Sequence, residues 1–81
     1  MKPPNHAKII GVYRGYDFPD YAIAPDSTIY SRRQNRYDWD SITPYFPSPG
    51  HKQVYVRLYH NDGHITVRVQ RLLAFVNMRT P

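Results

Sequence analysis

The sequence predicts a small α+β domain, in which a twisted antiparallel sheet of about four strands carries one short C-terminal helix on one face. Residues 54–69 alternate apolar and polar side chains on both sides of an Asp62-Gly63 turn, and residues 21–33 hold a second hairpin pattern. Residues 70–81 then space apolar side chains as a helix does. The chain has 81 residues, which suits one domain with a small core.

The N-terminal end divides into an arm and a first strand. Residues 1–8 are predicted to be a flexible arm, because they hold two prolines and no periodic pattern. Residues 9–81 are then the domain itself. Its first strand is expected over residues 9–12 and ends near Gly15.

The middle of the chain predicts a hairpin followed by a long loop. Residues 21–25 and 28–33 flank the turn signal Pro25-Asp26-Ser27, which favours two antiparallel strands. The three prolines within residues 44–49 then exclude a long central strand. We expect at most a short edge strand over residues 41–45.

The last two elements are a second hairpin and the helix. A two-residue Asp62-Gly63 loop sets Arg57 directly opposite Arg68 and gathers the apolar side chains on one face. The other face then carries Tyr55, Arg57, Tyr59, Thr66 and Arg68. Opposed arginines repel, so they either splay over the tyrosines and stay solvated or await an anion such as phosphate. After the hairpin, a two-turn helix is expected to pack on the apolar face of the sheet and to stop at Asn77.

Charge and composition limit the classes of function. Eleven Lys and Arg stand against six acidic residues, all Asp, for a net charge of +5. The Asp residues are expected in turns and loops, so that the strands carry only positive charge. The absence of Cys excludes disulfides and thiolate metal sites. With no apolar run long enough for a membrane span and no signal-peptide core, the sequence predicts a cytoplasmic location.

The residues predict neither a catalytic site nor a metal or cofactor site. His60 and His64 flank the turn and can approach each other, but no Cys or Glu completes a metal site. No serine lies in a G-x-S-x-G setting, and no glycine-rich phosphate loop is present. The order strand, loop, strand, helix, with His60 ending the first strand, is similar to a ββα-metal nuclease motif. Such a motif needs a ligand on the helix, where this chain offers only Asn77, so we expect no catalysis.

Two stretches resemble the N-terminal, NUMOD4-like region of HNH homing endonucleases, many of which phages encode. Residues 21–31, YAIAPDSTIYS, are similar to its Y-x-V-S-x-x-G-x-V-x-S signature, and residues 54–76 resemble the strand, turn, strand and helix that follow it. Three positions depart from the pattern: the Ser of the signature is Ala24, its turn Gly is Ser27, and the His that opens the helix is Gln70.

The resemblance implies the DNA-associated part of a nuclease without the part that cuts. The catalytic HNH segment of the family begins after the helix, whereas this chain ends within five residues of Val76. We therefore expect a non-catalytic, phage-encoded module that binds double-stranded DNA through a basic Tyr/Arg hairpin face. The candidate contacts are Arg57, Arg68, Tyr55, Tyr59, Arg32, Arg33, Arg36 and Lys52.

Two other functions fit the same residues. Tyr and Arg are enriched at protein hot spots, so the face equally suits a small inhibitor or adaptor of a host enzyme, such as one that processes nucleic acids. A nuclease completed by a second chain is the third reading. No cofactor, membrane or small-molecule substrate is expected.

Overall fold

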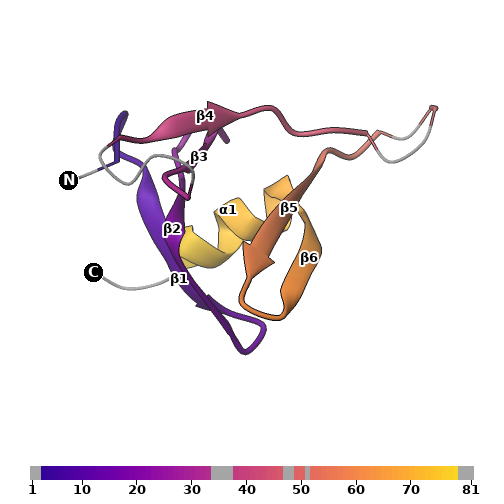
Figure 1. The fold of residues 1–81 in the computed structure, drawn as a ribbon. Coiled ribbons are helices and arrows are strands. Elements are labelled where there is room, and N and C mark those ends of the chain that lie inside the picture. Colours follow the sequence, from indigo (N-terminus) through magenta and orange to yellow (C-terminus); the bar gives the residue numbers. More distant parts are fainter. Residues whose placement is uncertain (1–2, 34–37, 47–48, 51, 79–81) are drawn as a thin grey trace.

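The computed structural model describes residues 3–33, 38–46, 49–50 and 52–78. Within these residues it holds six strands and one helix (Figure 1). In chain order they are β1 Lys8–Tyr13, β2 Tyr16–Ile23, β3 Ile29–Ser31, β4 Asp40–Ile42, β5 Tyr55–His60, β6 Gly63–Arg68 and α1 Val69–Met78. The predicted α+β fold class is confirmed.

The strands form two sheets that the helix joins. An antiparallel sheet has the order β1-β2-β3-β4, while β5 and β6 pair only with each other. Figure 1 shows α1 lying behind β5, and its contacts are with β1 and β2 on one side and β6 on the other. The predicted helix on one face of the sheet is therefore confirmed. It continues to Met78, so Asn77 does not stop it.

The main core lies where the two sheets and α1 meet. Nine of its side chains are essentially inaccessible to solvent: Ile10, Phe18, Ile23, Ile29, Val56, Leu58, Val67, Leu72 and Val76. Every strand except β4 contributes at least one of them, because each presents alternate residues to the same side. Burial of one such side chain contributes about 1.5–3 kcal/mol, so this cluster holds the two sheets against the helix.

A smaller cluster covers the opposite face of the first sheet. It consists of Ala22, Ala24, Tyr30 and Trp39, with Ala7 packed against it. Asn5 Nδ2 also donates to the Tyr30 hydroxyl at 2.6 Å. Part of the predicted arm thus contacts the sheet, whereas the flexibility of residues 1–8 stays a prediction.

The first hairpin of the structure, β1–β2, was only half predicted. Its turn is Arg14-Gly15, where φ is +53° and +82°, as in the primed turns that suit tight hairpins. The sequence indicated the strand before this turn but not the start of the next strand at Tyr16. Pro19 obscured it, because the proline lies where the register between β1 and β2 shifts, a bulge that tolerates a missing N–H.

The expectation that the strands carry only positive charge is wrong. Asp17 and Asp20 lie in β2, and Asp40 lies in β4. Asp17 and Asp40 are exposed, while Asp20 forms an ion pair with Arg32. Exposed or bulged strand positions accept Asp because its carboxylate stays solvated or paired there.

The register of the β5–β6 hairpin differs from the predicted one by two residues. His60 pairs with Gly63, so Arg57 faces Thr66 and Arg68 faces Tyr55. The predicted Arg57–Arg68 cross-strand pair is therefore wrong. The faces are nevertheless as predicted, because a shift of two residues leaves every side chain on its own side.

Backbone conformation explains where the turn falls. Asn61 and Asp62 form the two-residue loop without positive φ, and Gly63 takes φ +143° as the first residue of β6. The position that favours glycine is therefore the first residue of β6 and not one of the two loop residues, because a side chain at this positive φ would be strained.

The predicted hairpin of residues 21–33 is confirmed as β2–β3. In its turn the Ser27 N–H donates to the Ala24 carbonyl at 2.9 Å, and the Thr28 N–H donates to Asp26 Oδ1 at 3.0 Å. Ser27 has φ +74°. It therefore adopts the left-handed conformation for which the family signature uses Gly.

Replacing Ser27 with Gly should stabilise the protein. Glycine removes the steric cost of the left-handed conformation, and its greater backbone entropy in the unfolded chain offsets part of the gain, which leaves about 0.5–1 kcal/mol. Urea unfolding measures the difference. Thr28→Gly, in the same turn but without positive φ, is the matched control and should destabilise the protein. An S27G variant no more stable than the original chain would contradict this account.

Candidate nucleic-acid interface

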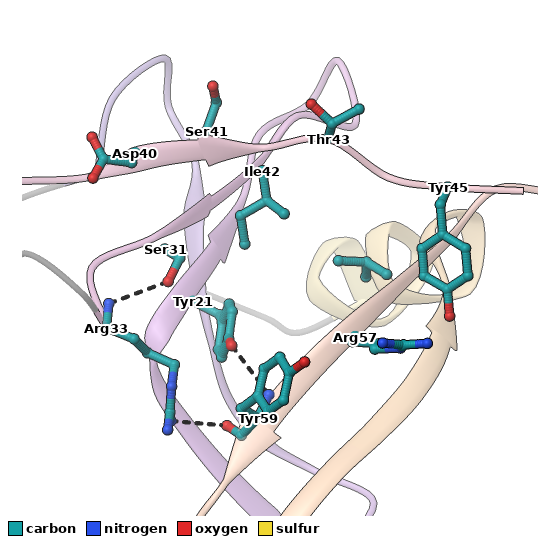
Figure 2. Close-up of a pocket in the computed structure, with 11 residues that line it drawn as sticks. Tyr21, Ser31, Arg33, Asp40, Ser41, Ile42, Thr43, Tyr45, Arg57 and Tyr59 are labelled. Carbon is teal, nitrogen blue, oxygen red and sulfur yellow. Dashed lines mark hydrogen bonds between the residues drawn. The ribbon is translucent and has the colours of Figure 1, made fainter.

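The β5–β6 hairpin is held to the first sheet through the backbone of Tyr59. Its N–H donates to the Tyr21 hydroxyl at 3.1 Å, and its carbonyl accepts from Arg33 Nη1 at 3.0 Å (Figure 2). Tyr21 is buried, and this burial raises the pKa of its phenol. The hydroxyl therefore stays neutral and remains an acceptor for the Tyr59 amide.

A groove of about 640 Å³ opens between β4 and β5. At one end the two chain segments meet, because Tyr45 and Tyr55 exchange backbone hydrogen bonds of 2.9 and 2.8 Å. At the other end the side chains of Tyr21 and Arg33 span the gap to Tyr59. The groove lies between the bridge and these side-chain contacts.

Arg57 projects into this groove from the middle of β5. Its guanidinium carbon lies 5.5 Å from the centre of the Tyr45 ring, within range of a cation–π interaction. Interaction with the phenol groups of Tyr45 and then Tyr59 raises the pKa of Arg57 further. The interpretation that the arginines splay over tyrosines thus applies to Arg57, with Tyr45 as a partner that the hairpin pattern could not indicate.

The outward surface of the hairpin is a second part of the site. We call it the basic hairpin face and define it by Tyr55, Arg57, Tyr59, His64, Thr66 and Arg68. Neither β5 nor β6 contains an acidic residue. Tyr59 is 44% exposed, with its ring centre 5.3 Å from that of His64. Arg68 is half-buried, and its Nε has no hydrogen-bond partner in the described part of the chain.

The other candidate residues lie in different surroundings. Arg32 pairs with Asp20 at 3.1 Å and lies 4.9 Å from the Trp39 ring centre, so its charge is balanced within the first sheet. Lys52 is exposed before β5 and does not line the groove. Arg36 lies outside the described residues. Of the predicted contacts, the structure therefore brings together Arg33, Tyr55, Arg57, Tyr59 and Arg68.

The two turn histidines lie on opposite faces of the hairpin, so the approach that the sequence allowed does not occur. His60 lies on the inner side of the hairpin, where its ring stacks on Tyr16 at 3.9 Å and its Nδ1 accepts from the Asp62 N–H at 3.2 Å. His64 lies on the outer side against Tyr59. Alternation along the strands separates them, since His60 pairs with Gly63 and His64 pairs with Tyr59. Within the described ranges no three His or Asp side chains gather as a metal site.

Tyr21 and Tyr45 are site residues that the sequence did not single out. Tyr21 opens a strand pattern, and Tyr45 ends the predicted edge strand, so both positions fit ordinary sheet residues. A tyrosine immediately before an apolar strand carries no sign that its hydroxyl caps a backbone amide 38 positions away. Only the tertiary fold reveals either role.

Replacing Tyr21 with Phe should destabilise the protein by about 1–2 kcal/mol, because the Tyr59 N–H then lacks its acceptor while the ring still fills the core. Urea unfolding at neutral pH measures the loss. Tyr16→Phe, on an exposed tyrosine, is the control and should change stability by less than about 0.5 kcal/mol. Equal effects of the two substitutions would show that the buried hydroxyl contributes nothing.

The hydrogen bond between Tyr21 and Tyr59 also predicts how the stability of the protein depends on pH. The folded-state pKa of Tyr21 is raised above its ordinary value of 10.0, so its contribution is fully present below about pH 10 and is lost as the pH rises through the folded-state pKa. The stability difference between the original chain and Tyr21→Phe should therefore shrink above pH 10. Urea unfolding across this range measures it, and a constant difference at alkaline pH would contradict the assignment.

No family model, curated protein sequence or solved structure matches this chain. The resemblance to the NUMOD4-like region accordingly rests on the two sequence motifs alone. The groove and the basic hairpin face are the features of this structure that bear on function.

Proposed function

We propose that the protein is a non-catalytic module that binds double-stranded DNA through its basic hairpin face. The observation that supports this proposal is a two-stranded surface that carries Arg57 and Arg68 among tyrosines, with no acidic residue on either strand. A two-stranded ribbon fits the major groove of DNA, where Arg binds guanine edges or phosphates.

The position of the hairpin leaves this face free for a ligand. Its inner face packs against the core through Val56, Leu58 and Val67, and α1 contacts β6. Its outer face is in contact with solvent, where Tyr59, His64 and Thr66 are exposed. The core thus holds the backbone of the ribbon, so that the outward side chains are presented on a fixed frame.

The polar groups of the face suit phosphate and base edges. Arg57 carries an exposed guanidinium that can donate charge-assisted hydrogen bonds to a phosphate oxygen, and the half-buried Arg68 adds a second positive charge on the neighbouring strand. Arg33 adds a third cation beside Tyr59. The net charge of +5 adds a longer-range attraction to any polyanion.

The cellular setting belongs to the same proposal. None of the described helices is long and apolar enough to cross a bilayer. A cytoplasmic location, within a phage-infected host if the sequence resemblance indicates the origin, would give the module access to DNA.

A protein partner is the second candidate function. Phe46 is 60% exposed next to the groove residue Tyr45, and exposed aromatic side chains beside Arg are typical of protein-binding surfaces. The module would then act as an adaptor or inhibitor of a host enzyme. This function would be favoured by a protein partner that is recovered from host lysate and stays bound after nuclease treatment. The Arg57→Ala variant should then fail to recover the same partner.

Replacing Arg57 with Ala should weaken DNA binding about tenfold, because one charge-assisted contact to a base or phosphate is lost. Fluorescence anisotropy with a labelled duplex measures the affinity. Arg71→Ala is the matched control, since it removes an equal charge from the exposed side of α1. It should weaken binding less than about threefold, the share expected from net charge alone.

The salt dependence of binding provides the second readout. Affinity should fall steeply with salt, and the double variant Arg57→Ala with Arg68→Ala should lower the slope of log K against log salt by about two. A duplex that fails to bind at low salt would refute the proposal. Equal losses for Arg57→Ala and Arg71→Ala would place the DNA on another surface.

A further inference from the structure

One residue of β5 leaves its backbone groups free in the groove. The N–H and carbonyl of Tyr55 bond to Tyr45, and those of Tyr59 bond to Tyr21 and Arg33. Backbone groups of alternate residues in an antiparallel strand point to the same edge, so those of Arg57, between the two, face the groove. The described part of the chain supplies no partner for them. Unpaired backbone groups of this kind favour a ligand that offers an acceptor and a donor side by side.

The walls around these groups are largely aromatic and apolar. Figure 2 shows Tyr45 and Tyr59 standing on either side of Arg57, while Ile42 points from β4 into the space between the strands. Ser41 of β4 and Thr43, which follows this strand, point the other way in this view, so this side of the groove presents mainly backbone and the Ile42 side chain. A flat ring with a polar edge matches these walls, because its faces contact tyrosine and its edge meets the backbone groups.

The charge of the groove favours an anion. Arg33 and Arg57 both line it, and the only acidic side chain among its described lining residues is Asp40. Figure 2 shows the Asp40 carboxylate pointing away from Arg57 and Tyr59. Two guanidinium groups near Tyr59 are therefore available to a phosphate.

An extended peptide fits this geometry poorly. Strand addition needs a run of unpaired backbone groups along an edge. On β5 the outward edge is already occupied at Tyr55 by Tyr45 and at Tyr59 by Tyr21 and Arg33, which leaves only Arg57. One free residue can hydrogen-bond a single ligand group but cannot pair with a strand.

We infer that the groove binds one unpaired nucleotide of a DNA strand, in addition to the duplex on the basic hairpin face. This inference rests on the proposed function and deepens it. The base lies against Tyr45 or Tyr59 with its edge on the Arg57 backbone, and its phosphate contacts Arg33 and the Arg57 side chain. A base inside a duplex cannot present its edge in this way, so the site requires a mismatched, frayed or single-stranded nucleotide.

The test compares a fully paired duplex with the same duplex carrying a central run of thymine–thymine mismatches. Fluorescence anisotropy should show that the original chain binds the mismatched DNA about tenfold more tightly, the range expected for stacking of a base on an aromatic ring. Tyr45→Leu should abolish this preference, so that the ratio of the affinities for mismatched and paired DNA falls from about ten to about one. Its backbone bridge to Tyr55 is kept, because that bridge uses main-chain atoms only.

Phe46→Leu is the matched control, since Phe46 is the neighbouring exposed aromatic residue and does not line the groove. It should retain the full preference for mismatched DNA. Equal affinity of the original chain for both DNAs would overturn the inference while the proposed function stands. Equal losses for Tyr45→Leu and Phe46→Leu would also overturn it. Failure to bind either DNA would refute the proposed function as well.

Discussion

The backbone of Tyr59 is the point on which the arrangement of this protein depends. Its N–H and carbonyl face away from β6 and are bound by the Tyr21 hydroxyl and the Arg33 guanidinium, which belong to the first sheet. These bonds tie the hairpin to that sheet at the end remote from the Tyr45–Tyr55 bridge. They also provide hydrogen-bond partners for the backbone of Tyr59 on the edge of β5 that faces away from β6.

The same constraint separates structural arginines from available ones. Arg32, one residue before Arg33, is paired with Asp20 and covers Trp39, which fits a role in stabilising the first sheet. Arg33 donates one hydrogen bond to the Tyr59 carbonyl, and this neutral acceptor leaves its positive charge unbalanced. Within the described part of the chain Arg57 forms no ion pair, and its guanidinium lies against Tyr45. The fold therefore places the guanidinium groups of Arg33 and Arg57, which carry charge that no carboxylate in the described residues balances, close to β5.

The sequence predicted much of the fold and less of the site. Alternation and turn residues found the β2–β3 and β5–β6 hairpins, and spacing of apolar residues found α1, because these signals are local. The face of each β5–β6 side chain could also be predicted, but the register could not. Because side chains alternate with a period of two, registers that differ by two residues place the same side chains on each face. The observed register is the one in which Gly63, with its positive φ, is the first residue of β6. The groove is bounded by a hydrogen bond between residues 38 positions apart, and a contact of this kind has no local signal in the sequence.

We propose that DNA contacts the basic hairpin face and the adjoining groove. Backbone amide chemical shifts, recorded by NMR while a short duplex is added to the labelled protein, test it most directly. The account predicts that the largest changes fall on Arg33, Arg57, Tyr59, Thr66 and Arg68, with small changes along α1 and β1. Largest changes on α1 or β1, or shifts spread evenly over the molecule, would contradict it.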